Sequence, residues 1–417
     1  MTQLFRPHYQ SSALRKKGNK FILWASELSP FALKIESLLQ FAGQPYQFLP
    51  AEGNRWQNFS IYAQLELAKR DKKAVRFPHD SELDEYPLVP YLLIDEKVFY
   101  YDSTGIAQWL DHQGLTGEQP VYGQDQAIAF LVLLIEEAFD EFGLYMVHHN
   151  RWVNSVNSNT AEQRLSKEFG KMLPGVISYA IGRRFAPRQV SRLPYLFSCA
   201  DKSIRYSTKK HQPPALDGFP ETHSLLDHAF VQYLDSIEAI LKRQPYIFGN
   251  SFTAADAAIY GQLGMNLSDP EAEKIIANRA PLTYRWLYRI AKGKHNHEPT
   301  SVDHWLDDAL KPLLSIIDKT FIHLMLQNEK AFEANRGLPL DSSFNESGFN
   351  RGLALYNGEL MGSPFRSVAK TFQVRVLTDL QKAWRSLLPE DKEILAPLVN
   401  HLEFFHQAFS PSSSHTT

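Results

Sequence analysis

The sequence has very little cysteine: its 417 residues include one, Cys199. A disulfide within the chain is therefore excluded, which is typical of proteins from a reducing compartment. We expect the lone thiol to be a small, buried apolar group. His295 and His297 have no cysteine or carboxylate cluster beside them to complete a ligand set, so we expect no metal site.

Long apolar runs and an excess of one charge are also missing. The first 20 residues have no apolar core, which argues against a signal peptide. The run 127–135 is far shorter than the roughly 20 residues that span a bilayer. The formal net charge of -2 gives no overall attraction to nucleic acid or acidic membranes. We expect a soluble, cytoplasmic protein with neither kind of partner.

Apolar residues are plentiful, at 44% hydrophobic and 12% aromatic, and the length exceeds one hydrophobic core. From residue 21 to about 113, strand and helix patterns alternate, as in an α/β domain. Residues 114–123 are rich in turn formers and are predicted to be a linker. Helical periodicity dominates the rest of the chain.

The first structured stretch is Phe21–Gly43. Its apolar start predicts a buried strand, and Ile35, Leu38 and Leu39 share one face of a following helix. Ser29 lies where strand gives way to helix, and Pro30 takes the first helical position. Taken alone, Ser29 is readily explained as a helix N-cap.

Two more stretches complete a pattern. Residues 86–95 predict a strand entered through Val89-Pro90, and residues 101–111 predict a helix that starts at Asp102-Ser103. With Ser29-Pro30-Phe31, these pieces resemble, in order, the thioredoxin-like domain of the glutathione transferases. Val89-Pro90 resembles that family's cis-proline, and Asp102-Ser103 its glutathione motif. Gly105 replaces the motif's usual alanine, and the resemblance is closest over the first quarter of the chain.

The resemblance implies a mixed four-stranded sheet and a reaction of the glutathione thiolate. A cysteine-like thiol has a pKa of about 8.5. Lowering it by two units needs about 2.7 kcal/mol, and one hydrogen bond to a charged group supplies about 1.5–3 kcal/mol. Ser29, the implied catalytic residue, would donate that bond. It cannot form a mixed disulfide, which favours conjugation over disulfide reduction.

The implied glutathione-binding residues are Phe31, Val89, Pro90, Asp102 and Ser103. A cis Val89-Pro90 bond would turn the Val89 backbone toward the cysteinyl part, although an ordinary trans proline at a strand start remains the alternative. Ser103 and its helix start suit the α-carboxylate of the γ-glutamyl end, and Asp102 its α-ammonium. A simple capping role for Ser103 is the competing interpretation.

The remaining chain fits the family's second, all-helical domain. Thr253 and Asp256 form a capping-box pattern, with Phe252 as half of a hydrophobic staple, and the resemblance makes these folding residues. The predicted division is 1–20 polar arm, 21–113 thioredoxin-like domain, 124–299 all-helical domain and 300–417 helical extension with a disordered tail. Arg184, Arg188 and Arg192 are either a solvated helix face or an anion-binding patch.

Two functions follow from the resemblance. The first is a glutathione transferase, expected as a homodimer, that uses glutathione as co-substrate and attacks a small electrophile. The second is a glutathione-transferase-like binding or scaffold protein with little turnover, whose long extension serves a partner.

Overall fold

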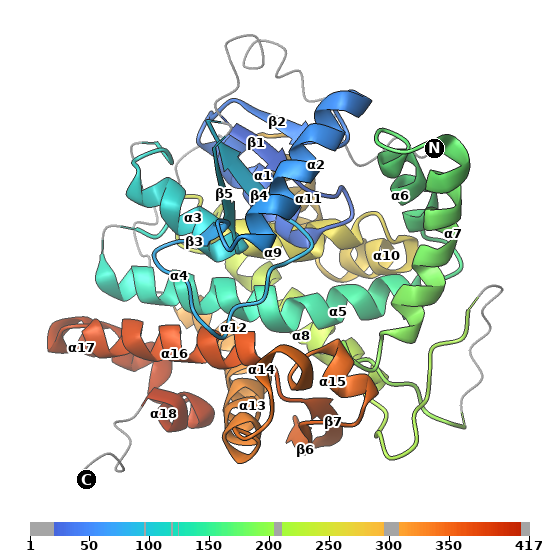
Figure 1. Ribbon diagram of the computed structural model, residues 1–417. Coiled ribbons are helices and arrows are strands. Elements are labelled where there is room, and N and C mark those ends of the chain that lie inside the picture. The colour runs from blue at the N-terminus through green and yellow to red at the C-terminus, as the bar shows by residue number, and fades with distance from the viewer. Residues whose placement is uncertain are drawn as a thin grey trace.

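The computed structural model describes residues 21–95, 97–117, 120–123, 125–203, 211–295 and 308–409. The predicted arm 1–20 and the predicted disordered tail, residues 411–417, lie outside these ranges. Figure 1 shows a small sheet with its helices above a long, interrupted helix, and the C-terminal segment beneath that helix. The mixed-sheet domain, the helical domain and the additional C-terminal helices were all predicted from the sequence.

The sheet has five strands in the order β2-β1-β4-β5-β3. β1 runs parallel to β2 and antiparallel to β4, β4 and β5 are antiparallel, and β3 is parallel to β5. The strands are β1 (Phe21–Trp24), β2 (Tyr46–Leu49), β3 (Val75–Arg76), β4 (Tyr91–Ile94) and β5 (Val98–Tyr101). The expected count of four strands was wrong, because the long segment between β2 and β4 adds β3 at the edge.

Alternating side chains on β1 bury both faces of this sheet. Phe21 and Leu23 belong to a core that includes residues of α1 (Pro30–Phe41) and α3 (Ser103–His112). Ile22 and Trp24 point the other way, into a second core with Ile61 of α2 (Arg55–Arg70). The sheet is thus covered by helices on both sides, as strands that are apolar at every position require.

The helical domain begins with one long helix that two π segments interrupt (Figure 1). Its parts are α4 (Gln126–Ala138), η1 (Phe139–Gly143), α5 (Leu144–His149) and η2 (Asn150–Asn154). The following helices are α6 (Ala161–Phe169), α7 (Gly175–Ser191), α8 (His223–Leu241), α9 (Ala254–Asn266), α10 (Pro270–Arg279) and α11 (Pro281–Ala291).

Helix α9 is buried along its whole length and packs on α1. A side chain at Gly261 would place its Cβ 2.6 Å from the Pro30 carbonyl oxygen, so glycine is what allows this close approach. The Thr253–Asp256 capping box starts α9 as predicted, with Phe252 buried beside it.

The C-terminal segment is mostly helical but contains a hairpin that the sequence analysis missed. Met361 and Gly362 both have positive φ, of 52° and 77°, which suits a tight hairpin turn. The elements are η3 (Asp308–Leu310), α12 (Lys311–Ile317), η4 (Asp318–Ile322), α13 (His323–Ala334), α14 (Leu340–Ser343), α15 (Glu346–Asn350), β6 (Leu355–Leu360), β7 (Ser363–Val368), α16 (Thr371–Ser386), α17 (Pro389–Val399) and α18 (Glu403–Phe409).

The extension shares its core with the helical domain. The ring of Phe130 on α4 lies 5.1 Å from Trp384 on α16 and 6.2 Å from Phe405 on α18. One continuous hydrophobic cluster contains these residues together with the core of α1 and α3. The extension is therefore packed into the body of the molecule, and its helix α16 lies along α4 (Figure 1).

Candidate active site

Three loop segments meet at the end of the sheet where β1 and β5 finish and β4 begins, which we call the sheet edge. Trp24, the last residue of β1, pairs with Tyr91, the first of β4, so Ser29 and Val89-Pro90 lie at the same edge. β5 is antiparallel to β4 and ends there too, which places Asp102 and Ser103 beside them. The topology brings together the residues that the sequence analysis selected.

Ser29 caps helix α1. Its Oγ accepts a hydrogen bond from the Ala32 backbone N–H at 3.3 Å, and the side chain is 8% exposed. A serine hydroxyl also has one O–H donor. Among the described residues no acceptor is found for that O–H, so capping leaves it available. Phe31 is half-buried in the first turn of the same helix.

Helix α6 holds the loop that precedes Ser29. Glu168 Oε2 accepts from the Glu27 backbone N–H at 2.9 Å and from Ser26 Oγ at 3.1 Å, and Arg164 donates to the Glu27 carbonyl at 2.7 Å. Burial raises the pKa of Glu168 to about 7, against the opposing effect of these two donors. The sequence analysis did not identify Glu168, which is 141 residues away from Glu27.

The Val89-Pro90 peptide bond is cis, as predicted. Val89 is half-buried, and no hydrogen-bond partner for its backbone N–H or C=O is found in the described part of the chain. A peptide ligand can pair with such a backbone as an added strand would.

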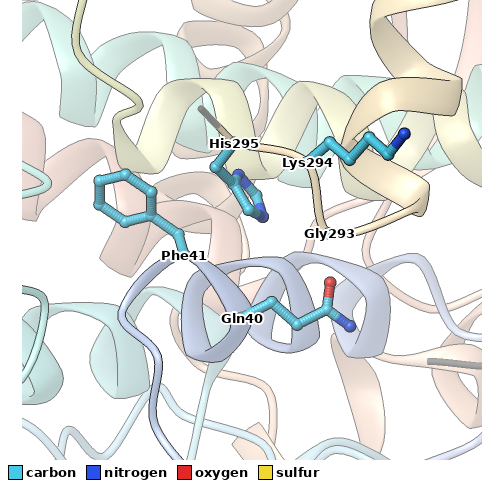
Figure 2. Close-up of a pocket in the computed structure, with 5 residues that line it drawn as sticks. All are labelled: Gln40, Phe41, Gly293, Lys294 and His295. Atoms are coloured by element: carbon cyan, nitrogen blue, oxygen red, sulfur yellow. The ribbon is translucent and has the colours of Figure 1, made fainter. Parts of the chain in front are cut away.

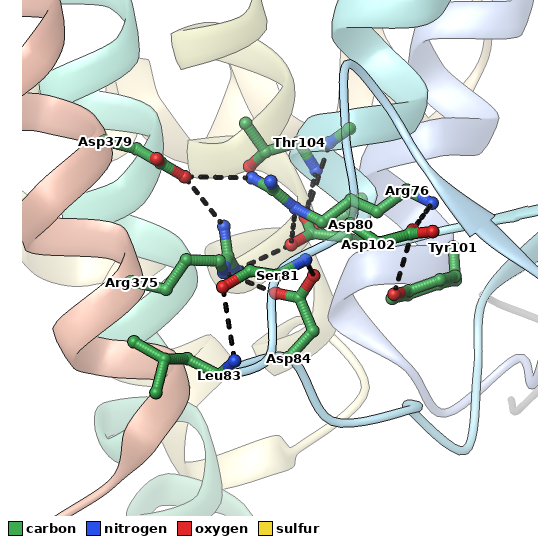
Figure 3. A network of polar contacts seen from close by, with 12 residues as sticks. Arg76, Asp80, Ser81, Leu83, Asp84, Tyr101, Asp102, Thr104, Arg375 and Asp379 are labelled. Atoms are coloured by element: carbon green, nitrogen blue, oxygen red, sulfur yellow. Dashed lines mark hydrogen bonds and ion pairs between the residues drawn. The ribbon is translucent and has the colours of Figure 1, made fainter. Parts of the chain in front are cut away.

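Asp102 is strained and highly connected. Its φ of 65° is rare for a residue other than glycine, and such outliers cluster at functional sites. Oδ1 caps α3 by accepting from the backbone N–H groups of Thr104 and Gly105. Oδ2 pairs with Arg76 Nε at 3.0 Å and Arg375 Nη2 at 2.7 Å (Figure 3). Burial opposes ionisation, yet the two guanidinium groups lower the pKa of Asp102 to about 2.

The hydroxyl of Ser103 faces the domain boundary. It accepts from Lys34 Nζ at 3.3 Å and donates to Asp140 Oδ2 at 3.2 Å. Asp102, and not Ser103, is the N-cap of α3. In the described residues the backbone N–H of Ser103 has no partner, so this N–H at a helix start, and not the hydroxyl, is the group open to an anion.

Arg375 ties the extension to two walls of the site. Its Nε lies 2.8 Å from Asp84 Oδ1, in the loop before Pro90, and Asp379 Oδ2 lies 3.5 Å from its Nη1 (Figure 3). Asp379 also pairs with Arg76, at 3.3 Å. The sequence analysis missed this network because Arg375 is 273 residues from Asp102 and carries no local motif.

Gly105, the departure from the family's motif, has a structural explanation. A Cβ there would lie 3.0 Å from the Phe77 carbonyl oxygen and 3.3 Å from Arg76 Cγ. These atoms belong to the inserted strand β3 and the residue after it. Glycine lets the insertion approach α3 closely enough for Arg76 to reach Asp102.

A second polar cluster lies where α16 begins. Lys370 Nζ donates to Tyr145 Oη at 2.5 Å and to the Tyr195 carbonyl at 3.3 Å, and Gln373 links Tyr145 to Glu141. Burial lowers the pKa of Lys370 to about 8 and raises that of Glu141 to about 7. The start of α16 thus places the ionisable side chain of Lys370 against α5 and links Gln373 to η1.

A pocket of about 320 Å³ lies elsewhere, between the end of α1 and the turn after α11 (Figure 2). Its lining includes Gln40, Phe41 and His295. Since α1 rises about 1.5 Å per residue, this pocket is roughly 16 Å from Ser29 and is separate from the site.

The remaining features that the sequence analysis singled out are the arginines of α7, Cys199, and the histidines His295 and His297. Arg188 and Arg192 lie 3.5 Å and 2.8 Å from Glu346 of the extension, and Cys199 is buried. His297 lies outside the described residues. Within those residues, no group of three or more His, Cys, Asp or Glu side chains is arranged to hold a metal ion. No helix in the described ranges is both long and apolar enough to cross a membrane.

Two family models match the chain. The N-terminal domain of glutathione S-transferases matches residues 23–114, which contain Ser29, Pro90 and Asp102. The C-terminal domain of the same enzymes matches residues 224–286, which contain the capping box. The chain belongs to the glutathione S-transferase superfamily. Neither match includes the C-terminal extension or any of the helices α4 to α7.

Solved glutathione S-transferases cover about two thirds of the chain. The enzyme from Pseudomonas fluorescens Pf-5 shares 13% identity over 67% of this chain and 98% of its own, with a TM-score of 0.33. The enzyme from Methylobacillus flagellatus KT, with glutathione bound, shares 14% sequence identity over 67% of this chain and 100% of its own, with a TM-score of 0.32. The enzyme from Rhodospirillum rubrum F11 shares 12% sequence identity over 70% of this chain and 99% of its own, with a TM-score of 0.33. No curated protein matched, and at these scores the superfamily assignment rests on the two domain models.

Proposed function

We propose that this protein binds glutathione at the sheet edge formed by Ser29, Val89-Pro90 and Ser103, and activates its thiol for attack on a small electrophile. The observation that carries the proposal is Ser29. Its oxygen caps α1 while its O–H keeps a proton to donate, at an edge shared with the cis Pro90 and the start of α3. The superfamily assignment supports the same edge.

The chemistry requires stabilisation of a thiolate. Ser29 donates one hydrogen bond to the sulfur, and the start of α1 adds about 0.3–1 kcal/mol. Together these meet the roughly 2.7 kcal/mol that a two-unit fall in pKa needs. The thiol proton leaves to water, the sulfur lone pair forms the new bond to carbon, and the electrophile releases its leaving group or takes up the electron pair. Ser29 forms no bond to carbon.

The rest of glutathione would lie along the same edge. The Val89 backbone pairs with the cysteinyl residue, and Pro90 and Phe31 border it. The γ-glutamyl end reaches the start of α3 at Asp102 and Ser103, where the Ser103 N–H can donate to the α-carboxylate. No metal takes part. The same proposal includes a cytoplasmic location and a homodimer. It also includes the division of the chain into arm, thioredoxin-like domain, helical domain and extension.

One observation favours the second function, a binding or scaffold protein with little turnover. The extension contacts the edge directly through Arg375 and contacts α5 through Lys370, which donates to Tyr145. An electrophile has less room next to Ser29 if these contacts persist during turnover.

Retention on glutathione-agarose, followed by turnover of an activated aryl halide, separates these functions. Retention that free glutathione reverses, together with conjugation, supports the transferase. Retention without conjugation supports the scaffold. A protein that is neither retained nor active contradicts both. A Pro90→Ala variant should lose retention, whereas Glu390→Gln, at an exposed position of α17, should behave as the parent does.

A further inference from the structure

The carboxylate of Asp102 has no hydrogen-bonding capacity left. A carboxylate offers about four lone-pair sites. Oδ1 uses two for the N–H groups of Thr104 and Gly105, at 3.0 Å and 3.4 Å. Oδ2 uses two for Arg76 Nε and Arg375 Nη2, at 3.0 Å and 2.7 Å. An ammonium group from a ligand would have to displace one of these donors.

Neither guanidinium is easily displaced. The side chain of Arg76 is 3% exposed and that of Arg375 is 9% exposed. Arg375 is held from three sides, by Asp102, Asp84 and Asp379, which lie on three different segments of the chain. Asp379 also holds Arg76, so one carboxylate fixes both cations. Movement of either arginine would leave buried charges unpaired, which is costly.

From this geometry we infer that Arg375 is a specificity-determining residue that takes the place of the ligand's α-ammonium at Asp102. The inference rests on the proposed function and assigns Asp102 a task other than the ammonium contact predicted from the sequence. An incoming ammonium would find every lone pair of Asp102 occupied, two of them by guanidinium donors. The γ-glutamyl end is therefore recognised by its α-carboxylate, with the Ser103 N–H as donor, and its amine contributes nothing.

The ligand class follows from this chemistry. The site takes thiols whose far end carries a carboxylate four or so bonds from the amide, with or without an amine on the same carbon. Glutaryl-cysteinyl-glycine, which is glutathione without its amino group, is the direct probe. Arg375 offers the test substitution, because methionine keeps its length and removes its charge.

Isothermal titration of the full-length chain with both peptides tests the inference. For the parent protein, the two dissociation constants should agree within about twofold. In Arg375→Met, Asp102 regains a lone pair, and glutathione should bind about tenfold more tightly than the analogue, as expected for one charge-assisted hydrogen bond. Arg385→Met is the matched control on the same helix, since Arg385 is exposed and its guanidinium donates to the side chain of Gln381. It should leave the ratio unchanged.

The outcomes are distinct. A parent protein that prefers glutathione by tenfold or more overturns the inference and leaves the proposed function standing. A ratio near one in Arg375→Met as well shows that Arg375 is not the determinant. Failure of the parent to bind either peptide removes the proposed function, and the inference with it. The parent ratio needs no variant, so the test holds even if Arg375→Met does not fold.

Discussion

Lys34 Nζ lies 2.5 Å from Asp140 Oδ2 and 2.6 Å from Glu136 Oε1, with the lysine completely buried. Lys34 belongs to α1 of the sheet domain, and both carboxylates belong to the long interrupted helix of the helical domain. Burial alone would lower the pKa of Lys34, but Asp140 and Glu136 raise it, so the ammonium form persists. These two ion pairs thus join the sheet domain to the helical domain, next to the hydroxyl of Ser103.

Lys34→Met should therefore destabilise the protein by about 3–5 kcal/mol, because it leaves buried carboxylates without their cation. Urea unfolding at pH 7 measures the loss. Lys274→Met is the control, since the Lys274–Glu271 pair at 2.8 Å is exposed and should contribute at most about 1 kcal/mol. Equal effects of the two substitutions would contradict the buried ion pair.

Gly105→Ala should cost about 1–3 kcal/mol by overpacking, since its Cβ meets the Phe77 carbonyl oxygen at 3.0 Å. Gly175→Ala, at the start of α7, is a suitable comparison because no atom lies within 4 Å of its added Cβ. That substitution should be neutral or slightly stabilising. If thermal unfolding shows no difference between the two variants, β3 does not pack on α3 as described.

Thr253→Ala should destabilise the protein by roughly 0.5–2 kcal/mol through the lost cap. Asp256→Ala should cost more, about 2–4 kcal/mol, because Asp256 also accepts from the buried Ile247 N–H at 2.9 Å and from the Thr253 N–H. Denaturant titration of both variants shows which substitution lowers the free energy of unfolding more. A larger loss from Thr253→Ala would show that the contact with Ile247 is unimportant.

Glu168 predicts a pH dependence. Its pKa is about 7 in the folded protein and about 4.5 when unperturbed, so the folded state binds the extra proton between these values. The stability that Glu168 contributes is complete below pH 4.5 and is lost as the pH rises through 7. Glu168→Gln cannot titrate. The stability of the parent relative to this variant should fall by up to about 3 kcal/mol from pH 4.5 to 8.5. A constant difference would show that Glu168 is not buried in this way.

The sequence was most informative where a function depends on local spacing. Ser29 after a strand, cis Pro90 before one and the Thr253 capping box each depend on a few neighbouring residues, and these local features formed as expected. Contacts of distant residues could not be predicted. In the sequence, Arg375 looks like any other polar residue of helix α16. Its ion pair with Asp102 depends on how the extension packs against the rest of the molecule.

Two errors have related causes. Strand β3 has two residues, too few for a period-2 pattern to be visible. The β6–β7 hairpin carries alternating polarity only weakly, and its turn at Met361-Gly362 is not among the strongest turn sequences. Gly105 was the one local clue, because its departure from the family's alanine marks where the inserted strand approaches α3.

Thiol activation by Ser29 is the central claim, and thiolate absorbance of bound glutathione against pH tests it most directly. Ser29→Ala should raise the pKa of the bound thiol by about one to two units, the equivalent of a hydrogen bond of roughly 1.5–3 kcal/mol, with little change in affinity. Ser60→Ala, which removes an exposed hydroxyl on α2 that accepts from the side chain of Gln64, should leave that pKa where it is in the parent. Identical titrations of the parent and Ser29→Ala would contradict the account and leave Ser29 as a helix cap.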